Sequence, residues 1–181
     1  MDSLSEGQVH LKTRQSIGTQ LMQEVDTLRR HLVDLLTGGN AHVNLEGALK
    51  GLPPKLRGVK PKGSEYTAWQ LLEHIRIAGW DILEFSRNPK HVSPAWPAGY
   101  WPKTEAPPSA AAWSKSVKQI RADLEAMRKL VQSKKSDLFR PIPHGQGQTL
   151  LREALLLADH NAYHIGQLVL LRRLLGAWPA R

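Results

Sequence analysis

Residues 155–168 read LLLADHNAYHIGQL, and this stretch indicates both a fold and a candidate site. Its apolar residues recur every three or four positions, which predicts a helix with one buried face. His160 and His164 lie on that face. Because residues four apart stack about 6 Å from each other on a helix, the two rings can aim at one point. They are either core histidines with their own hydrogen-bond partners or ligands of a bound group.

The same periodicity occurs in three earlier segments. Together the patterns predict helices over about 16–36, 67–87, 109–132 and 149–175. Thr67 and Gln70 fit a capping box at the start of the second helix, and Ser109 follows two prolines as the cap of the third. Gly176 and Pro179 are typical of a helix end. Because no strand pattern of similar strength occurs, we expect an all-α single domain over residues 1–181.

Four long helices favour a four-helix bundle. Residues 88–108, between the second and third helices, can run back along a helix of about 20 residues, which measures roughly 30 Å. This long crossover loop would let the second and third helices run parallel. The expected order is therefore up-down-down-up, with the second and fourth helices antiparallel.

The composition narrows the classes of function. The 181 residues include no cysteine, so a metal site must use histidines and carboxylates. The chain has neither a signal-peptide pattern nor an apolar run of about 18 residues, which predicts a cytoplasmic protein with no membrane partner. The net charge is +9, but the lysines and arginines are scattered and are not interleaved with aromatic residues. We interpret this charge as solvated helix faces and do not expect nucleic acid as a partner.

A third histidine, His74, lies beside the buried stripe of the second helix. At about 1.5 Å per residue, it lies roughly 20 Å from the end of that helix, and His160 and His164 lie equally far from the start of theirs. All three rings then reach one level if the helices are antiparallel. Three histidines with an open coordination position are typical of catalytic zinc, although nickel, iron and manganese accept the same ligands. The alternative is three separately satisfied histidines, and the matched depth favours metal.

Two segments, LLEHIRIAGWDILEFSRNP (71–89) and LLREALLLADHNAYHIGQLVLLRRLLGAWP (150–179), resemble the DinB/YfiT-like superfamily of metal-binding four-helix bundles. The family pattern is a histidine early in the second helix and H-x-x-x-H in the fourth, filled here by His74, His160 and His164. The resemblance implies a divalent metal, commonly zinc or nickel, held by these residues. Family members include transferases and isomerases that use low-molecular-weight thiols, and others are classed as metal-dependent hydrolases. Many are dimers, which implies a homodimer here.

Polar neighbours of the histidines have two interpretations. Asp81 and Glu153 each lie seven residues from one of the histidines on the same helix face, and Gln167 follows His164 by three. Each either orients a ligand ring or is a polar residue at the bundle boundary. Asn161 stands where zinc proteases of the H-E-x-x-H type carry a catalytic glutamate, which argues against a peptidase.

Three further residues are predicted to lie outside the site. Glu73 points about 100° away from the neighbouring histidine and is interpreted as a surface carboxylate. Tyr163 is interpreted as a buried aromatic residue, and His144 as a loop residue too far from the histidine pair to bind the same ion. Aromatic residues among prolines in residues 93–108 predict an ordered loop. This loop either walls the metal pocket or covers the apolar groove between the second and third helices, and we favour the groove.

The expected function is that of a metal-dependent enzyme that activates a low-molecular-weight thiol or water against a small-molecule substrate. Because the chain has no cysteine, the thiol would come from a cofactor. The alternatives are a non-catalytic metal- or ligand-binding bundle and, with only the net charge in its favour, a DNA-associated protein. The sequence identifies no catalytic residue and no residues that bind a thiol cofactor.

Overall fold

The computed structural model describes residues 6–179. Its long helices are α1 (Glu6–Thr37), α3 (Ala68–Arg87), α4 (Ala110–Gln132) and α5 (Leu150–Leu174). The connections contain the short helix α2 (Leu45–Leu49) and two 3-10 turns, η1 (Pro54–Leu56) and η2 (Ala98–Tyr100). Residues 6–179 include no β-strand, and one isolated bridge joins Pro141 to Thr149. The predicted all-α class is confirmed. Within the same range, no helix combines the length and the apolar character that crossing a bilayer requires.

Side-chain caps explain where three of the helices begin. The Thr67 hydroxyl accepts a hydrogen bond from the Gln70 backbone N–H, and the Gln70 side chain accepts one from the Thr67 backbone N–H, so the capping box is present. Ser109 and Thr149 each accept from the third backbone N–H of their helices. Each cap contributes about 1 kcal/mol by pairing a donor that the helix itself leaves free. These starts agree with the predicted ones to within a residue.

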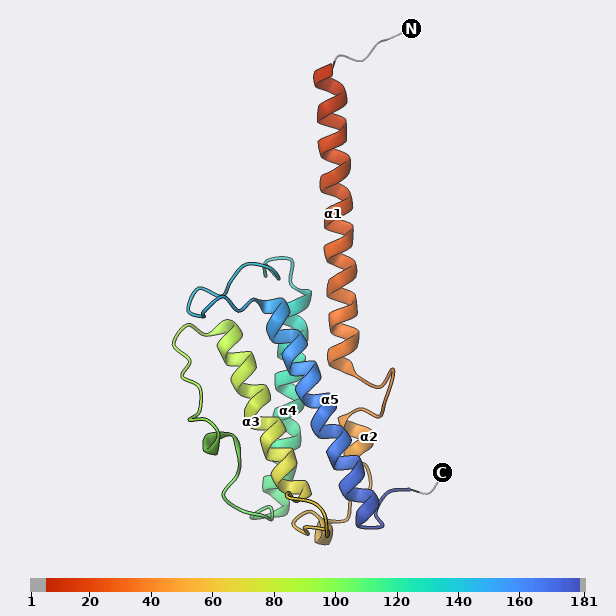
Figure 1. Ribbon diagram of the computed structural model, residues 1–181, viewed down its shortest axis with the longest axis vertical. Helices are drawn as coiled ribbons and strands as arrows, with labels where there is room; N and C mark the ends of the chain where they lie inside the picture. The colour runs from red at the N-terminus through yellow and green to blue at the C-terminus, as the bar shows by residue number, and fades with distance from the viewer. Residues whose placement is uncertain (1–5, 180–181) are drawn as a thin grey trace.

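The first helix differs from its prediction. It begins at Glu6, well before the expected start near residue 16, and extends beyond the other helices in Figure 1. In its second half, Leu32 and Leu36 are 2% and 5% exposed. Leu21, on the predicted buried face, is 55% exposed. Periodicity identifies the face that would be buried, but not whether another element lies against it.

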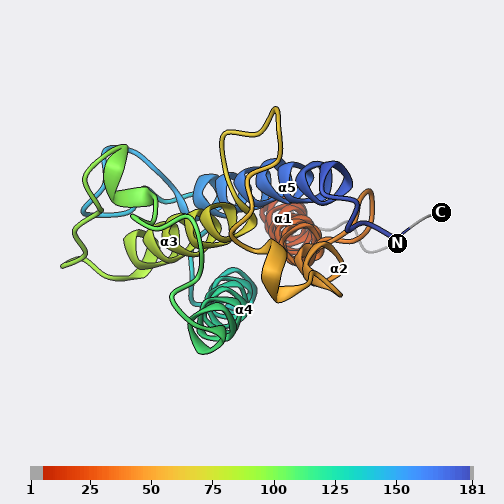
Figure 2. The same cartoon turned by 90° about the horizontal axis from the view of Figure 1, so that it is seen from below.

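The four long helices pack pairwise around a shared core. α3 contacts α4 and α5, and α1 contacts the same two helices. The colour gradient in Figure 1 shows that α3 and α4 run in one direction while α1 and α5 run in the other. Figure 2 shows α5 on one side and α4 on the other side of the α1–α3 layer. Residues 88–108 run back along α3, which is why α4 starts at the same end as α3.

The core consists of two apolar clusters. The first joins α2, the start of α3, the first half of α4 and the end of α5, and includes Leu45, Leu72, Trp113 and Leu168. The second joins α1, the end of α3, the end of α4 and the start of α5, and includes Leu32, Leu83, Met127 and Leu157. On α5, His160 and His164 occupy sequence positions between the two clusters, whereas His74 on α3 lies between Leu72 and Ile75 of the first. Burial of this kind is worth about 25 cal/mol per Å² of apolar surface, so packing of α3 against α5 is what fixes the histidine-bearing helices relative to each other.

Candidate metal centre

Three imidazole rings from two helices meet beside the α3–α5 contact. The ring centroids of His74, His160 and His164 are 4.5, 4.5 and 4.9 Å apart. One nitrogen from each ring lies within 4.8 Å of the others, and the Nε2 atoms of His74 and His160 are 3.1 Å apart. A tetrahedral zinc ion with bonds of about 2.0–2.1 Å holds its ligand atoms about 3.3 Å apart. The structure therefore brings all three predicted residues together at a spacing that one ion could bridge after small side-chain movements.

Hydrogen bonds at the outer nitrogens determine which nitrogen carries the proton in two of the rings. His74 Nδ1 donates to the carbonyl oxygen of Tyr100 at 2.9 Å, and His164 Nδ1 donates to Gln167 Oε1 at 2.7 Å. In a neutral imidazole the other nitrogen, Nε2, then carries a lone pair, and the Nε2 atom of His74 lies 3.1 Å from that of His160. Without a cation, His160 Nε2–H donates to His74 Nε2, which leaves the buried Nδ1 atom of His160 with no hydrogen-bond partner within residues 6–179. The donor set thus has the chemistry of a cation site.

The protein environment keeps the three rings neutral. The pKa of His160 is lowered to about 4, first by burial and then by the proximity of His164 and His74, while the Asn161 side chain acts in the opposite direction. Burial is also the main cause that lowers the pKa of His74 and of His164. Because a metal ion binds only unprotonated imidazole, all three rings are in the ligating form at neutral pH.

The crossover loop forms one wall of the site. The Trp101 ring stacks on the His74 ring with centroids 4.0 Å apart and planes 1° from parallel. Tyr66 stacks in turn on Trp101, at 4.1 Å and 11°. We favoured a loop that only covers the groove between α3 and α4, and the contacts of Tyr100 and Trp101 with His74 correct that expectation. The aromatic residues were visible in the sequence, but a backbone carbonyl that holds a ring has no residue signature.

The three polar neighbours behave differently. Gln167 accepts a hydrogen bond directly from the His164 ring, as one of its two interpretations required. Asp81 instead accepts hydrogen bonds from His91 Nε2 at 2.7 Å and from the Tyr100 hydroxyl at 2.6 Å. Burial and then Asp81 raise the pKa of Tyr100 to about 12, so its phenol stays protonated as a donor. Glu153 is 2% exposed and pairs with the preceding arginine at 2.7 Å, so its partner is not a ligand ring.

Two of the residues predicted to lie outside the site have different surroundings from those expected. Glu73 is a buried carboxylate that accepts two hydrogen bonds from Arg76, because α4 and α5 both pack on α3 and leave little of that helix exposed. Tyr163 is 64% exposed, so it is not a buried aromatic residue, although its ring centroid lies 4.9 Å from that of His164. His144 donates to the carbonyl of Phe85 and is not part of the histidine cluster, as predicted.

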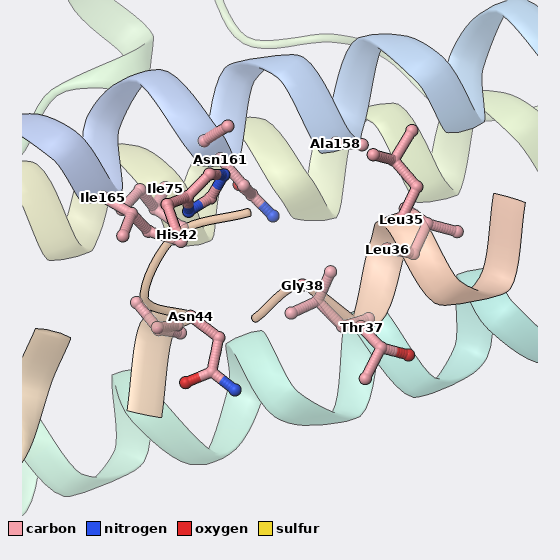
Figure 3. Close-up of a pocket in the computed structure, with 13 residues that line it drawn as sticks. Leu35, Leu36, Thr37, Gly38, His42, Asn44, Ile75, Ala158, Asn161 and Ile165 are labelled. Carbon is pink, nitrogen blue, oxygen red and sulfur yellow. The ribbon is translucent and has the colours of Figure 1, made fainter. Parts of the chain in front are cut away.

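A small cavity lies near the end of α1, between that helix and α5. Figure 3 shows Asn161, His42 and Ile75 near one end of it and Leu35 and Leu36 near the other. Its volume is about 60 Å³, and the buried Oδ1 atom of Asn161 has no hydrogen-bond partner within residues 6–179. A water needs about 10–15 Å³ of such volume, so the cavity has room for a few ordered waters. Asn161 thus lines a cavity at the sequence position next to His160.

Comparison with known proteins identifies one family. Residues 40–168 match the model described as the DinB superfamily, and the matched segment includes all three clustered histidines. No curated protein and no solved structure matches the chain.

Proposed function

Since this chain belongs to the DinB superfamily, we propose that its three clustered histidines hold one divalent metal ion at the centre of a metal-dependent enzyme. The observation that carries the proposal is the convergence of three neutral imidazoles whose ligand-capable nitrogens lie within 4.8 Å of one another. A divalent ion at such a site supplies Lewis acidity, which polarises a carbonyl or lowers the pKa of a bound water or thiol. Zinc and nickel are the proposed metals.

The chain's own residues prepare the site for that chemistry. The Tyr100 carbonyl holds the His74 ring with its Nε2 atom toward His160, and Gln167 holds the His164 ring, so little ring reorientation is needed on binding. Trp101 excludes water from one face of His74. We propose a small-molecule substrate, with either water or a low-molecular-weight thiol as the nucleophile. The thiol would be a cofactor, because the chain contains no cysteine.

Elemental analysis of the purified protein tests the metal site. We expect about one equivalent of zinc or nickel in the wild type and its loss in His160→Ala, because two histidines alone do not complete a three-ligand site. His31→Ala, which removes an exposed histidine from α1, is the matched control and should retain the metal. Equal metal content in all three proteins would refute the assignment, provided that circular dichroism shows each to be folded.

Removal of the metal separates an enzyme from a non-catalytic bundle. The two apolar clusters are complete without an ion, so the protein should stay folded in EDTA. We expect turnover in a panel of thiols and electrophiles to disappear with the metal and return when it is restored. Unfolding in EDTA, together with no turnover by the loaded protein, would instead support a structural metal in a binding module.

Four further expectations are also proposals. The opposite directions of α1 and α5 relative to α3 and α4 support an up-down-down-up four-helix bundle. The family resemblance supports a homodimer, which light scattering after size-exclusion chromatography would test. A cytoplasmic location and the lack of a nucleic-acid partner rest on the sequence patterns, and a salt-dependent DNA shift would overturn the second.

A further inference from the structure

One carboxylate on α3 anchors the crossover loop at two points. Asp81 Oδ1 accepts from His91 Nε2 near the start of the loop, and Asp81 Oδ2 accepts from the Tyr100 hydroxyl thirteen positions after Arg87, where α3 ends. The side chains of His91 and Asp81 are only 5% and 12% exposed, so both bonds are largely shielded from water. Charge-assisted hydrogen bonds of this kind are short and about twice as strong as neutral ones. The loop is therefore fixed to the same helix that carries His74.

The anchored residue is the one whose backbone holds His74. The Tyr100 carbonyl accepts a hydrogen bond from His74 Nδ1–H, and the next residue, Trp101, stacks on the same ring. A carbonyl can only accept, so its position selects the His74 tautomer with Nδ1 protonated and Nε2 free. If Tyr100 moved, the ring would lose both its tautomer preference and its orientation.

We infer that Asp81, Tyr100 and His91 are positioning residues for the metal centre, acting on His74 through the backbone of the crossover loop. The expected effect on metal binding rests on the proposed function. The expected effect on the tautomer and orientation of the His74 ring does not. The carboxylate lies two helical turns beyond His74 and touches none of the three clustered rings. It acts through the phenol, the loop backbone and the Tyr100 carbonyl, in that order.

Tyr100→Phe is the sharpest perturbation, because it removes only the hydroxyl that reaches Asp81. Side-chain nitrogen NMR of the metal-free protein reads the tautomer of His74 directly. We expect the wild type to hold His74 mainly as the Nδ1–H tautomer and Tyr100→Phe to show a mixture. Asp81→Asn should shift the His74 tautomer populations in the same direction, because the amide N–H₂ group would face either His91 Nε2–H or the Tyr100 hydroxyl, and both are donors. Unchanged tautomer populations in both variants would overturn the inference, whatever the metal affinity.

Tyr163→Phe is the matched control. It removes the same atom from an exposed ring whose centroid lies 4.9 Å from that of His164. We expect this control to leave the His74 tautomer unchanged. If both tyrosine variants alter it equally, the effect is a general loosening of the bundle and the positioning role is wrong.

Zinc titration against a competing chelator tests whether the position of the His74 ring affects metal affinity. Removal of an outer hydrogen-bond partner weakens metal binding by about 10- to 100-fold, and we expect that loss for Tyr100→Phe and less than twofold for Tyr163→Phe. An equal loss of zinc affinity in Tyr100→Phe and Tyr163→Phe would contradict the inference. A wild type that fixes the tautomer but binds no zinc would refute the proposed function and leave the positioning role standing.

Discussion

The buried carboxylate of Asp123 predicts a stability gain on neutralisation. Asp123 is 7% exposed; its Oδ1 accepts from Gln119 at 2.9 Å, and its Oδ2 has no partner within residues 6–179. Burial is the main cause that raises its pKa above 3.8. The amide of Asp123→Asn can keep the Gln119 bond and carries no charge, so the substitution should remove the cost of desolvating an ion.

The magnitude follows from the unpaired oxygen. An unsatisfied buried polar group costs about 1–3 kcal/mol, and the nearby positive charges of Arg87 and Arg76 reduce that cost. We therefore expect Asp123→Asn to add about 1 kcal/mol to the free energy of unfolding at pH 7. For a chain of this size that corresponds to a rise in Tm of roughly 2–4 °C.

The sign of the pH dependence of stability distinguishes the Asp123 carboxyl from other causes of a stability gain. A carboxyl with a raised pKa binds more protons in the folded state, so stability falls as pH rises from the unfolded pKa through the folded pKa. The advantage of Asp123→Asn should be close to zero below pH 3.8 and complete at neutral pH. Urea unfolding across this range measures it. A gain that does not depend on pH, or a loss at pH 7, would refute the reasoning.

Asp137 provides the control with the opposite sign. Asp137 is exposed, and its carboxylate accepts hydrogen bonds from the backbone N–H groups of Phe139 and Arg140. These hydrogen bonds lower its pKa. Its contribution is present above the unfolded pKa and is lost as pH falls through the folded pKa. Asp137→Asn should therefore be neutral or destabilising at pH 7, and a gain equal to that of Asp123→Asn would indicate a general charge effect.

Two further substitutions test other parts of the structure. Gln167→Leu removes the hydrogen-bond acceptor of His164 Nδ1 and should weaken zinc binding about tenfold. Gln167→Glu keeps an acceptor at this position and should retain the wild-type affinity. Equal zinc affinities of the two variants in a chelator competition would contradict this prediction. Arg172 is 1% exposed and donates to the carbonyls of Ala48 and Ala177, so Arg172→Met should lower the free energy of unfolding by about 2–4 kcal/mol. A change below about 0.5 kcal/mol in urea unfolding would show that these carbonyls find other partners.

Local physical chemistry makes much of the secondary structure readable from the chain. A cap acts within three residues, as at Thr67, and an apolar stripe repeats within one helix, so both are written in short stretches of sequence. The pair His160 and His164 is local in the same sense. Even the depth of His74 could be counted along its helix, given an antiparallel neighbour.

The pattern of residues was enough to predict three of the four long helices closely and the three histidines of the candidate centre. It did not predict that Leu21 is exposed on α1, that Glu73 is buried against Arg76, or that the Tyr100 carbonyl accepts a hydrogen bond from His74. The physical reason is that such contacts depend on where a loop or helix packs across the fold. Every residue has a carbonyl, so nothing in the one-dimensional pattern marks the one that holds a ring.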